Sequence, residues 1–480
     1  MKKIIAIGFS IFLLTGIFLY AADAERCMQS IDFSNLFKIV KYLASDELQG
    51  RLSGHEGFNK AAEWAAGKFK DWGIKPVYND YYRRFNVDYN DITDNFIQLL
   101  LPGKDNTEII KPLKLMEEYV PELYSGFGEA EAEVVFAGYG ITVYQQGWDD
   151  YAGLDVKGKI VLVLAGFPAI PGKNFSSYWE DGRHKSVNAK ERGALALIRI
   201  SFSSLGGVVG DRYVEGLPMI RVSEHIAPLF FSPSGMSVKE IKGKLDKGQN
   251  ITFNTGVRAK LMVSGVHHPA AVTFDVVGMI EGSDPALKNE YVLIGAHLDH
   301  VGCMPLLFPG ADDNASGVAV VMEIARAFSM LKEQPKRSVA FILFAAEERG
   351  GGGDKSSILD EMPKYPSNLL WMVNFDMVGV GDAAAVAGAD VDPELFSIME
   401  KVMKQYSIRS KITAVKNEGM MSRSDHSAFQ RRHIPSYGNW TNGEDNGYHT
   451  DKDTIYKITP QIMEDLARTY FMAIYRFLEK

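Results

Sequence analysis

The sequence is poor in cysteine, with only Cys27 and Cys303 among its 480 residues. Two thiols so far apart cannot provide the disulfide framework that stabilises many small secreted domains. Burial of apolar side chains must therefore stabilise the fold. At this length the chain exceeds one ordinary core, and two domains are the first expectation.

An excess of positive charge is also missing. The chain has 52 Lys and Arg against 60 Asp and Glu, a formal net charge of −8, and no basic stripe. Nucleic acid is therefore excluded as an expected partner. With 46% hydrophobic and 23% charged residues, the composition is that of a globular protein and excludes disordered and collagen-like classes. We find no repeats or low-complexity tracts.

Long hydrophobic runs are absent except at the N-terminus. There, Lys2 and Lys3 precede an apolar run over residues 4–20, followed by Ala22-Asp23-Ala24. This pattern predicts a secretory signal peptide over residues 1–24, and hence a secreted or periplasmic protein with no stable membrane insertion after cleavage. The alternative is an uncleaved anchor helix, for which the run is of marginal length.

The pattern of apolar and polar residues changes twice after the expected signal peptide. Residues 25–130 begin with helical patterns, and residues 131–263 carry short β-branched runs separated by glycines, which predicts a β-rich insert. Over residues 264–480, apolar runs at 291–296, 339–345 and 369–375 alternate with helical patterns. Runs without polar alternation indicate strands covered on both faces. We therefore expect an α/β fold with a mostly parallel central sheet flanked by helices.

Residues that bind metals well follow each of these apolar runs. The first run is followed by His297 and Asp299, the second by Glu347 and Glu348, and the third by Asp376. Open α/β sheets bind ligands beyond the carboxyl ends of their strands. The sequence thus predicts one crevice into which three strand ends direct these side chains.

Two further segments add to this pattern. The acidic loop 309–317 contains Asp312 and Asp313 and leads into a helical pattern, and His449 lies in a polar loop near the C-terminus. Taken singly, each acidic residue is explained as well by a helix cap or a solvated loop, and His449 by a surface position. Together, imidazoles and carboxylates are the ligands that two zinc ions need, with one carboxylate shared between them.

The motifs resemble those of a known family. The strings at 295–300 (Gly-Ala-His-Leu-Asp-His), 310–317, 347–348, 374–377 and 448–450 resemble the co-catalytic zinc aminopeptidases of peptidase family M28, which are related to bacterial leucyl aminopeptidase and glutamate carboxypeptidase. Residues 45–51 resemble the N-terminal region of bacterial members. Residues 153–161 look like part of the protease-associated insert domain that many members carry.

The resemblance implies a zinc-peptidase fold, peptide substrates and two zinc ions. It implies that Asp312 bridges the ions, and that Asp299 accepts the second ring N–H of His297 and fixes its tautomer. A cis peptide between Asp312 and Asp313 is also implied. The complete expected ligand set is His297, Asp312, Glu348, Asp376 and His449.

The position of Glu347 beside a ligand predicts a general base, which takes the proton from a water bridging the metals and passes it to the departing amine. The expected function is an exported zinc-dependent aminopeptidase. A carboxypeptidase or dipeptidase of the same family, or a non-catalytic binding ectodomain, are the alternatives. Arg423, Arg431 and Arg432 would matter for a carboxypeptidase, because arginine clamps carboxylates.

The chain also departs from the family pattern. Met421 stands where some members have a substrate-polarising tyrosine, for which Tyr448 or Tyr437 is a weak substitute. Four glycines at 350–353 replace bulkier residues. Cys303, close to the motif at 295–300, is either an adventitious ligand or an inert thiol.

Overall fold

The computed structural model describes residues 22–180, 182–203, 205–206, 213–304, 306–349, 368–416, 424–443 and 447–480. The chain forms two compact units. Unit 1 comprises Met1–Val87, Val272–Gly302 and Leu307–Lys480, and unit 2 comprises Asp88–Ala271 and Cys303–Leu306. Every residue of the expected metal site belongs to unit 1.

Unit 1 is built on a mixed sheet with the strand order β16-β15-β17-β14-β12-β13-β11. Its centre is parallel and consists of β13 (Ser338–Phe344), β12 (Tyr291–His297), β14 (Leu369–Phe375) and β17 (Ser436–Thr441). The strand β15 (Ala383–Ala387) runs antiparallel to β17 and parallel to β16 (Lys411–Val415). At the other edge, β11 (Thr252–Ile280) is antiparallel to β13 and also pairs with β1 (Lys75–Pro76). The expected mostly parallel α/β sheet is confirmed.

The central strands are buried on both faces. In β12, Ile294 and Ala296 belong to the large cluster on one face, whereas Tyr291 and Leu293 belong to a smaller cluster on the other. This arrangement explains the unbroken apolar run, because successive side chains point to opposite faces and neither face meets water.

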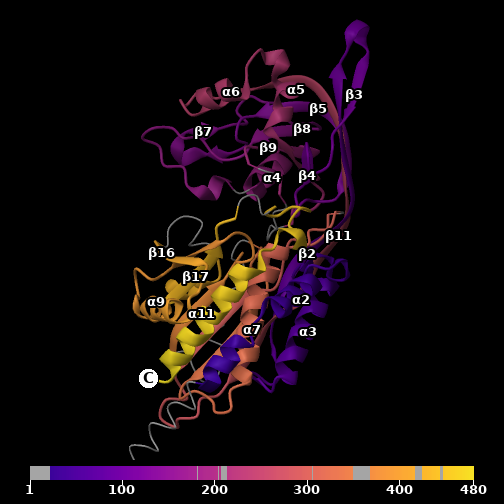
Figure 1. Cartoon of the computed structure of the whole chain (residues 1–480). Helices are drawn as coiled ribbons and strands as arrows, with labels where there is room; N and C mark the ends of the chain where they lie inside the picture. Colours follow the sequence, from indigo (N-terminus) through magenta and orange to yellow (C-terminus); the bar gives the residue numbers. More distant parts are fainter. Residues whose placement is uncertain are drawn as a thin grey trace, which may run out of the picture. The chain divides into compact units, whose positions relative to one another are not determined.

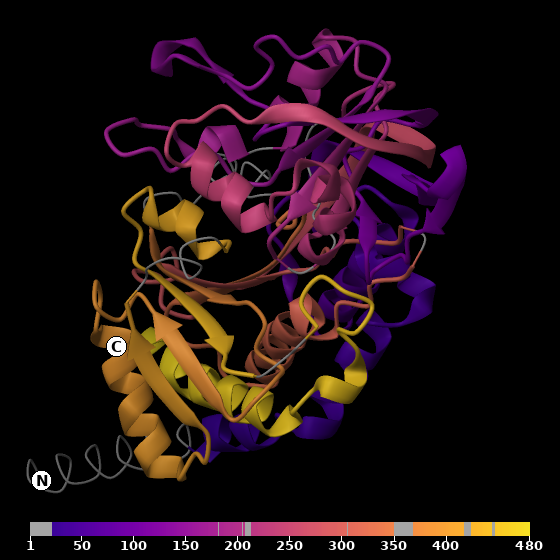
Figure 2. The ribbon, with the colours of Figure 1, turned by 90° about the horizontal axis from the view of Figure 1, so that it is seen from above.

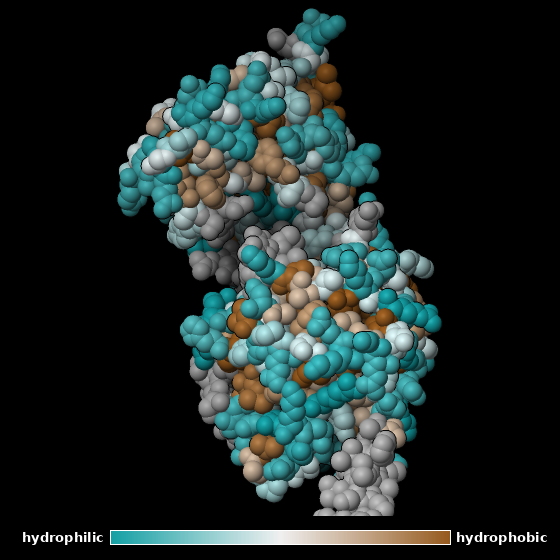
Figure 3. Space-filling view, turned by 60° about the vertical axis from the view of Figure 1, so that its left-hand side comes forward, coloured by the Kyte–Doolittle hydropathy of each residue, from teal (hydrophilic) through white to brown (hydrophobic). Residues whose placement is uncertain are grey.

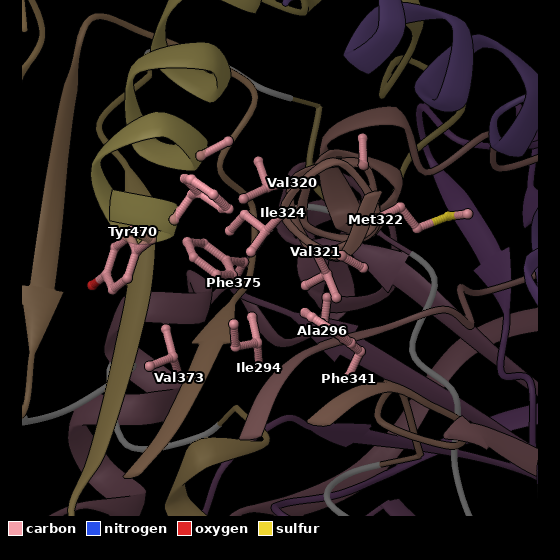
Figure 4. Packing of buried hydrophobic residues seen from close by; sticks show 14 of the residues in the cluster. Ile294, Ala296, Val320, Val321, Met322, Ile324, Phe341, Val373, Phe375 and Tyr470 are labelled. Carbon is pink, nitrogen blue, oxygen red and sulfur yellow. The ribbon is translucent and has the colours of Figure 1, made fainter. Parts of the chain in front are cut away.

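At least five helices contribute to the large cluster, and Figures 1 and 2 show α11 lying beside α9. Side chains from α7, the central strands and α11 interdigitate, as Figure 4 shows for Ile294, Ile324, Phe375 and Tyr470. The smaller cluster includes Phe429 of α10 (His426–Gln430). The five helices are α2 (Phe33–Leu43), α3 (Glu56–Asp71), α7 (Gly317–Ser329), α9 (Glu394–Tyr406) and α11 (Pro460–Leu478).

Strand register brings the motifs to one edge of the sheet. His297 at the end of β12 pairs with Phe344 at the end of β13, and Gly295 pairs with Asn374 near the end of β14. Because these strands are parallel, the residues that follow them emerge at the same edge.

In unit 2, neighbouring strands follow the order β11-β5-β8-β9-β10-β4. The unit also contains the hairpin of β2 with β3, and a short pair, β6 (Thr142–Val143) with β7 (Trp148–Asp149). The strands are β2 (Tyr82–Pro102), β3 (Glu108–Pro112), β4 (Tyr119–Pro121), β5 (Gly128–Ala137), β8 (Ile160–Leu164), β9 (Ala196–Ser201) and β10 (Met219–Ser223), and the helices are α4 (Gly182–Glu191), α5 (Ala227–Phe231) and α6 (Val238–Leu245).

The boundaries of unit 2 differ from the insert expected at 131–263. The unit begins at Asp88 and ends at Ala271, because the long strands β2 and β11 each run through a boundary without a break. The position at which the residue pattern changes therefore does not coincide with the boundary between the two units. The assignment as a protease-associated domain stays a prediction.

The face shown in Figure 3 is mainly hydrophilic, and its hydrophobic residues lie in small separate groups. Within the described ranges, no helix has both the length and the apolar character needed to span a bilayer. Residues 1–21 of the expected leader lie outside the described part. Ala24, its expected last residue, is fully buried in the large cluster.

Candidate metal centre

Asp313 lies at the middle of the site. Its Oδ1 is 3.3 Å from Nε2 of His297, and its Oδ2 is 3.1 Å from Nε2 of His449. The two carboxylate oxygens of Asp313 thus face different histidines. Two sets of side chains that could each hold a metal ion share Asp313, namely His297, Asp313 and Asp376 on one side and His300, Asp313, Glu348 and His449 on the other.

Different elements supply these side chains. His297 ends β12, Glu348 follows β13, and Asp376 follows β14, with its Oδ1 3.2 Å from Nε2 of His297. Asp313 lies in η7 (Ala311–Ser316), the turn that precedes α7, and His449 lies in the loop before η9 (Ile455–Lys457). The structure therefore brings together four of the five expected ligands. In place of the fifth, Asp312, its neighbour Asp313 lies among them.

Asp312 does not occupy the shared position expected for it. Its Oδ1 accepts the backbone N–H of Gly379 at 2.7 Å, and its carbonyl accepts the hydroxyl of Ser316, also at 2.7 Å. Asp312 therefore ties η7 to the segment after β14, and Asp313 faces the histidines. The cis peptide is likewise displaced by one residue, since it joins Asp313 to Asn314.

The Asp299 side chain has a different partner from the expected one. Nδ1 of His297 lies 3.1 Å from the backbone carbonyl oxygen of Asp299, while the nearest carboxylate oxygen is 3.8 Å away. The main chain of Asp299 thus orients the imidazole. Its carboxylate accepts the backbone N–H groups of Glu347 at 3.1 Å and Glu348 at 3.3 Å.

A carboxylate and a guanidinium hold the loop around Asp313. Asp453 accepts the backbone N–H groups of Asp312 at 2.8 Å and Asp313 at 3.0 Å. Burial raises the pKa of Asp453 to about 8, although these two hydrogen bonds act in the opposite direction. Arg51, at the end of η1 (Asp46–Arg51), is fully buried and donates to the backbone carbonyls of Leu43, Leu298, Pro309 and Gly310.

The electrostatics of the site favour charged carboxylates. Burial raises the pKa of Asp313, yet hydrogen bonds from His297 and His449 hold that pKa well below its ordinary value. Burial and the nearby Asp313 charge also raise the pKa of Glu348, but contacts with His449 and His300 bring it down to about 2. Deprotonated carboxylates are the form that binds metal.

Four of the candidate metal ligands face a pocket of about 320 Å³. It is lined by His297, Asp313, Glu347, Glu348 and Asp376, together with Asn374, Met377, Ser424, His426, Gly438, Asn439, Trp440, Thr441 and Tyr448. No lysine or arginine occurs among the described residues that line it. The pocket is therefore an acidic cavity with an apolar wall.

The donor set fits zinc. Imidazole nitrogens and carboxylate oxygens are its usual ligands besides thiolates, and the seven donor positions divide into two sets around one shared carboxylate. Cys303 is in neither set. Its side chain is half-buried, and burial raises the pKa of its thiol, which makes the expected inert thiol the better description.

Residues 275–474, which contain all of these side chains, match peptidase family M28. This part of the chain belongs to peptidase family M28. The M28 region thus spans most of unit 1 and includes both candidate metal sets.

Similar proteins extend beyond the M28 region. Leucine aminopeptidase 2 from Trichophyton rubrum is 25% identical over 336 residues, which cover 63% of this chain and 59% of that protein. A probable glutamate carboxypeptidase from Arthroderma benhamiae is 26% identical over 473 residues, covering 82% of this chain and 63% of that protein. The chain therefore spans about three fifths of the length of these relatives.

Among solved structures, an aminopeptidase from Aneurinibacillus sp. strain AM-1 has the same fold. The two structures agree with a TM-score of 0.66 over 94% of this chain and 95% of that chain, at 22% identity. The likeness thus covers unit 2 as well as the M28 region.

His300 was missed by the sequence analysis. It is the last residue of the string Ala-His-Leu-Asp-His, and a second imidazole so close to the first is the signal that could have found it. Tyr437, by contrast, is buried outside the pocket and donates to the carbonyl of Asp392 at 2.6 Å, so only Tyr448 reaches the site. Met421, Arg423 and the glycines at 350–353 lie outside the described residues, and Arg431 and Arg432 do not line the pocket.

Proposed function

We propose that the chain is an exported zinc-dependent aminopeptidase that removes N-terminal residues from peptides and holds two zinc ions in the M28 region. One observation supports this most directly. Asp313 presents one carboxylate oxygen to each of two sets of candidate metal-binding side chains, and it lines the same pocket as Glu347. The relative from Trichophyton rubrum, named as a leucine aminopeptidase, supports the same assignment.

Zinc bound at these positions would polarise the scissile carbonyl and lower the pKa of a water molecule toward neutrality. His297, Asp313 and Asp376 would hold one ion, and Glu348 and His449 would share Asp313 for the other. Glu347 lines the same pocket and belongs to neither set.

Glu347 is the general base in this proposal. Its carboxylate takes the proton of the water that attacks the peptide carbonyl, and it gives that proton to the nitrogen of the departing amine. The net reaction adds one water across the peptide bond. Asp299 fixes the main chain that carries this side chain, because its carboxylate accepts the backbone N–H of Glu347.

The lining of the pocket gives little support for a carboxypeptidase. The described lining residues include Asp313, Glu347, Glu348 and Asp376 but no cation. A carboxypeptidase needs an arginine or lysine for the substrate carboxylate, and the described lining residues include neither. A carboxypeptidase or dipeptidase is therefore the second candidate, and a non-catalytic ectodomain has no use for a base at position 347.

A panel of matched peptides tests this assignment. Each peptide is offered to the zinc-loaded protein with a free amino terminus, with an acetylated amino terminus, and with an amidated carboxyl terminus. We expect acetylation to abolish cleavage and amidation to leave it intact. Cleavage that survives acetylation but not amidation would replace the aminopeptidase by a carboxypeptidase, and no cleavage of any peptide would leave a binding protein.

A further inference from the structure

We propose that His300 is a fourth protein ligand of one zinc ion, so that the two ions of the proposed enzyme have unequal coordination. The ion beside Glu348 would be enclosed by four side chains. The ion beside Asp376 would have three protein ligands and open positions toward the pocket. This inference rests on the proposed two-zinc function and specifies which ion meets the substrate.

The first argument is the distances between donor atoms. Nδ1 of His300 is 2.8 Å from Oε1 of Glu348 and 3.9 Å from Oδ2 of Asp313. Nε2 of His449 is 2.8 Å from Oε2 of Glu348 and 3.1 Å from the same Oδ2 of Asp313. Ligands of a tetrahedral zinc ion with bonds of about 2.0 Å are about 3.3 Å apart, which is the middle of this range.

The second argument is the orientation of the two imidazoles. The rings of His300 and His449 have centroids 5.6 Å apart and planes inclined at 75°. They therefore approach Glu348 and Asp313 from different directions, as ligands at separate corners of a tetrahedron do. A ring that served only as packing would need no nitrogen aimed at two carboxylates.

The surrounding chain fixes the ring of His300 in this place. Its side chain is fully buried, and its backbone N–H donates to the carbonyl of Arg51 at 3.1 Å. Gly310 has a φ of +61°, and a Cβ on it would lie 2.5 Å from Cδ2 of His300. Only glycine allows this close approach, so the site is built around the imidazole.

The third argument is access from the pocket. All three members of the set with Asp376 line the pocket, whereas in the other set Asp313 and Glu348 line it and His300 and His449 do not. Zinc sites closed by four protein ligands are usually structural, and sites with three keep a position for water or substrate. His297, Asp313 and Asp376 would therefore hold the ion that is open to the substrate, and the set with His300 would hold an ion whose main role is to fix Asp313 and Glu348.

The alternative role of His300 is to donate a hydrogen bond from Nδ1 to Glu348 without touching the metal. The variant His300→Asn separates the two roles, because an asparagine amide can donate that hydrogen bond but is a poor zinc ligand. His433→Asn is the matched control. His433 is exposed, belongs to neither metal set, and has a φ of +60°, which asparagine tolerates.

The experiment titrates zinc into the metal-free full chain and follows the heat of binding. We expect wild type and His433→Asn to bind two equivalents with unequal affinities. We expect His300→Asn to lose more than about 100-fold in affinity for the tighter equivalent, the upper end of what loss of an outer-shell partner costs. Thermal unfolding of the metal-free variants checks that each remains folded.

Cobalt provides a second readout. The visible absorption of Co²⁺ depends on its ligands and its coordination number, so the spectrum of the first equivalent should differ between wild type and His300→Asn. If both affinities and the spectrum are unchanged in that variant, His300 only orients Glu348 and the inference is wrong. If wild type itself binds no zinc, the proposed function has failed instead.

Discussion

The carboxylate of Asp299 accepts the backbone N–H of Glu347 at 3.1 Å. Its second oxygen accepts the N–H of the next residue, Glu348, at 3.3 Å. Ala346, just before them, has a φ of +60°, a conformation that an alanine adopts only when its surroundings enforce it. One buried side chain after β12 thus fixes the main chain that carries both the proposed base and a proposed ligand.

Glu347→Gln should separate catalysis from metal binding. Glutamine keeps the shape of the side chain but cannot take a proton, so we expect kcat to fall by about 10²-fold to 10⁴-fold. Bound zinc, measured by atomic emission, should stay near the wild-type amount because Glu347 is in neither ligand set. The exposed Glu400→Gln on α9 is the control and should keep full activity. Undiminished turnover in Glu347→Gln would remove the base from the mechanism.

Asp313→Asn and Asp312→Asn form a matched pair at adjacent positions. Asp313 faces both sets of ligands, so its replacement should weaken uptake of both ions and reduce turnover by orders of magnitude. Asp312 accepts the N–H of Gly379, and an asparagine oxygen can still do so; this variant should therefore keep its zinc. Metal content and kcat/KM are measured for both. The reverse result would restore Asp312 as the shared ligand.

Arg51→Met should destabilise the whole chain. The guanidinium donates to four backbone carbonyls, and methionine would remove this donor from all of them; among the described residues, only the carbonyl of Gly310 would still accept a backbone N–H, that of Ala315. We expect a loss of about 3–5 kcal/mol in the free energy of unfolding, measured by urea denaturation of the metal-free protein. Arg409→Met at an exposed site should change it by less than about 0.5 kcal/mol. Equal stability of the two variants would contradict this account of Arg51.

Asp150 should make stability depend on pH. It is fully buried and accepts the N–H groups of Tyr139 and Ile141, but burial raises its pKa to about 6 from an ordinary 3.8. Between these values the folded chain keeps a proton that the unfolded chain releases. Its contribution is therefore complete below about pH 4 and declines by on the order of 3 kcal/mol as pH rises through 6.

Asp150→Asn removes this titration. Urea unfolding at several pH values should show that the difference between wild type and Asp150→Asn shrinks or reverses as pH rises from about 4 to 6. The exposed Asp390→Asn should follow wild type across the same range. A difference between wild type and Asp150→Asn that stays constant with pH would show that this carboxylate does not change its protonation there.

Several features of the fold follow from local patterns that the sequence displays openly. Residues 291–296, 339–345 and 369–375 are apolar without alternation, and the structure has β12, β13 and β14 there, each buried on both faces. Parallel strands end at one edge, so the proximity of His297, Glu348 and Asp376 could be predicted from their positions along the chain.

Two features of the structure could not be predicted from the sequence, namely the boundary of unit 2 and the place of His300. The sequence texture changes at residue 131, but β2 carries the chain into unit 2 at Asp88, and nothing in the residues of a continuous strand marks where one core ends. His300 was overlooked because its chemistry duplicates that of His297, and its burial beside Gly310 depends on residues brought together by folding.

The sequence by itself determined the kind of site, because imidazoles and carboxylates placed after buried parallel strands have few other uses. Only the tertiary structure decided between Asp312 and Asp313, which are adjacent and chemically identical. The choice depends on the direction in which η7 turns, and that turn is set by contacts with distant residues, among them Gly379 and Asp453. Such long-range hydrogen bonds leave no periodic trace in a sequence.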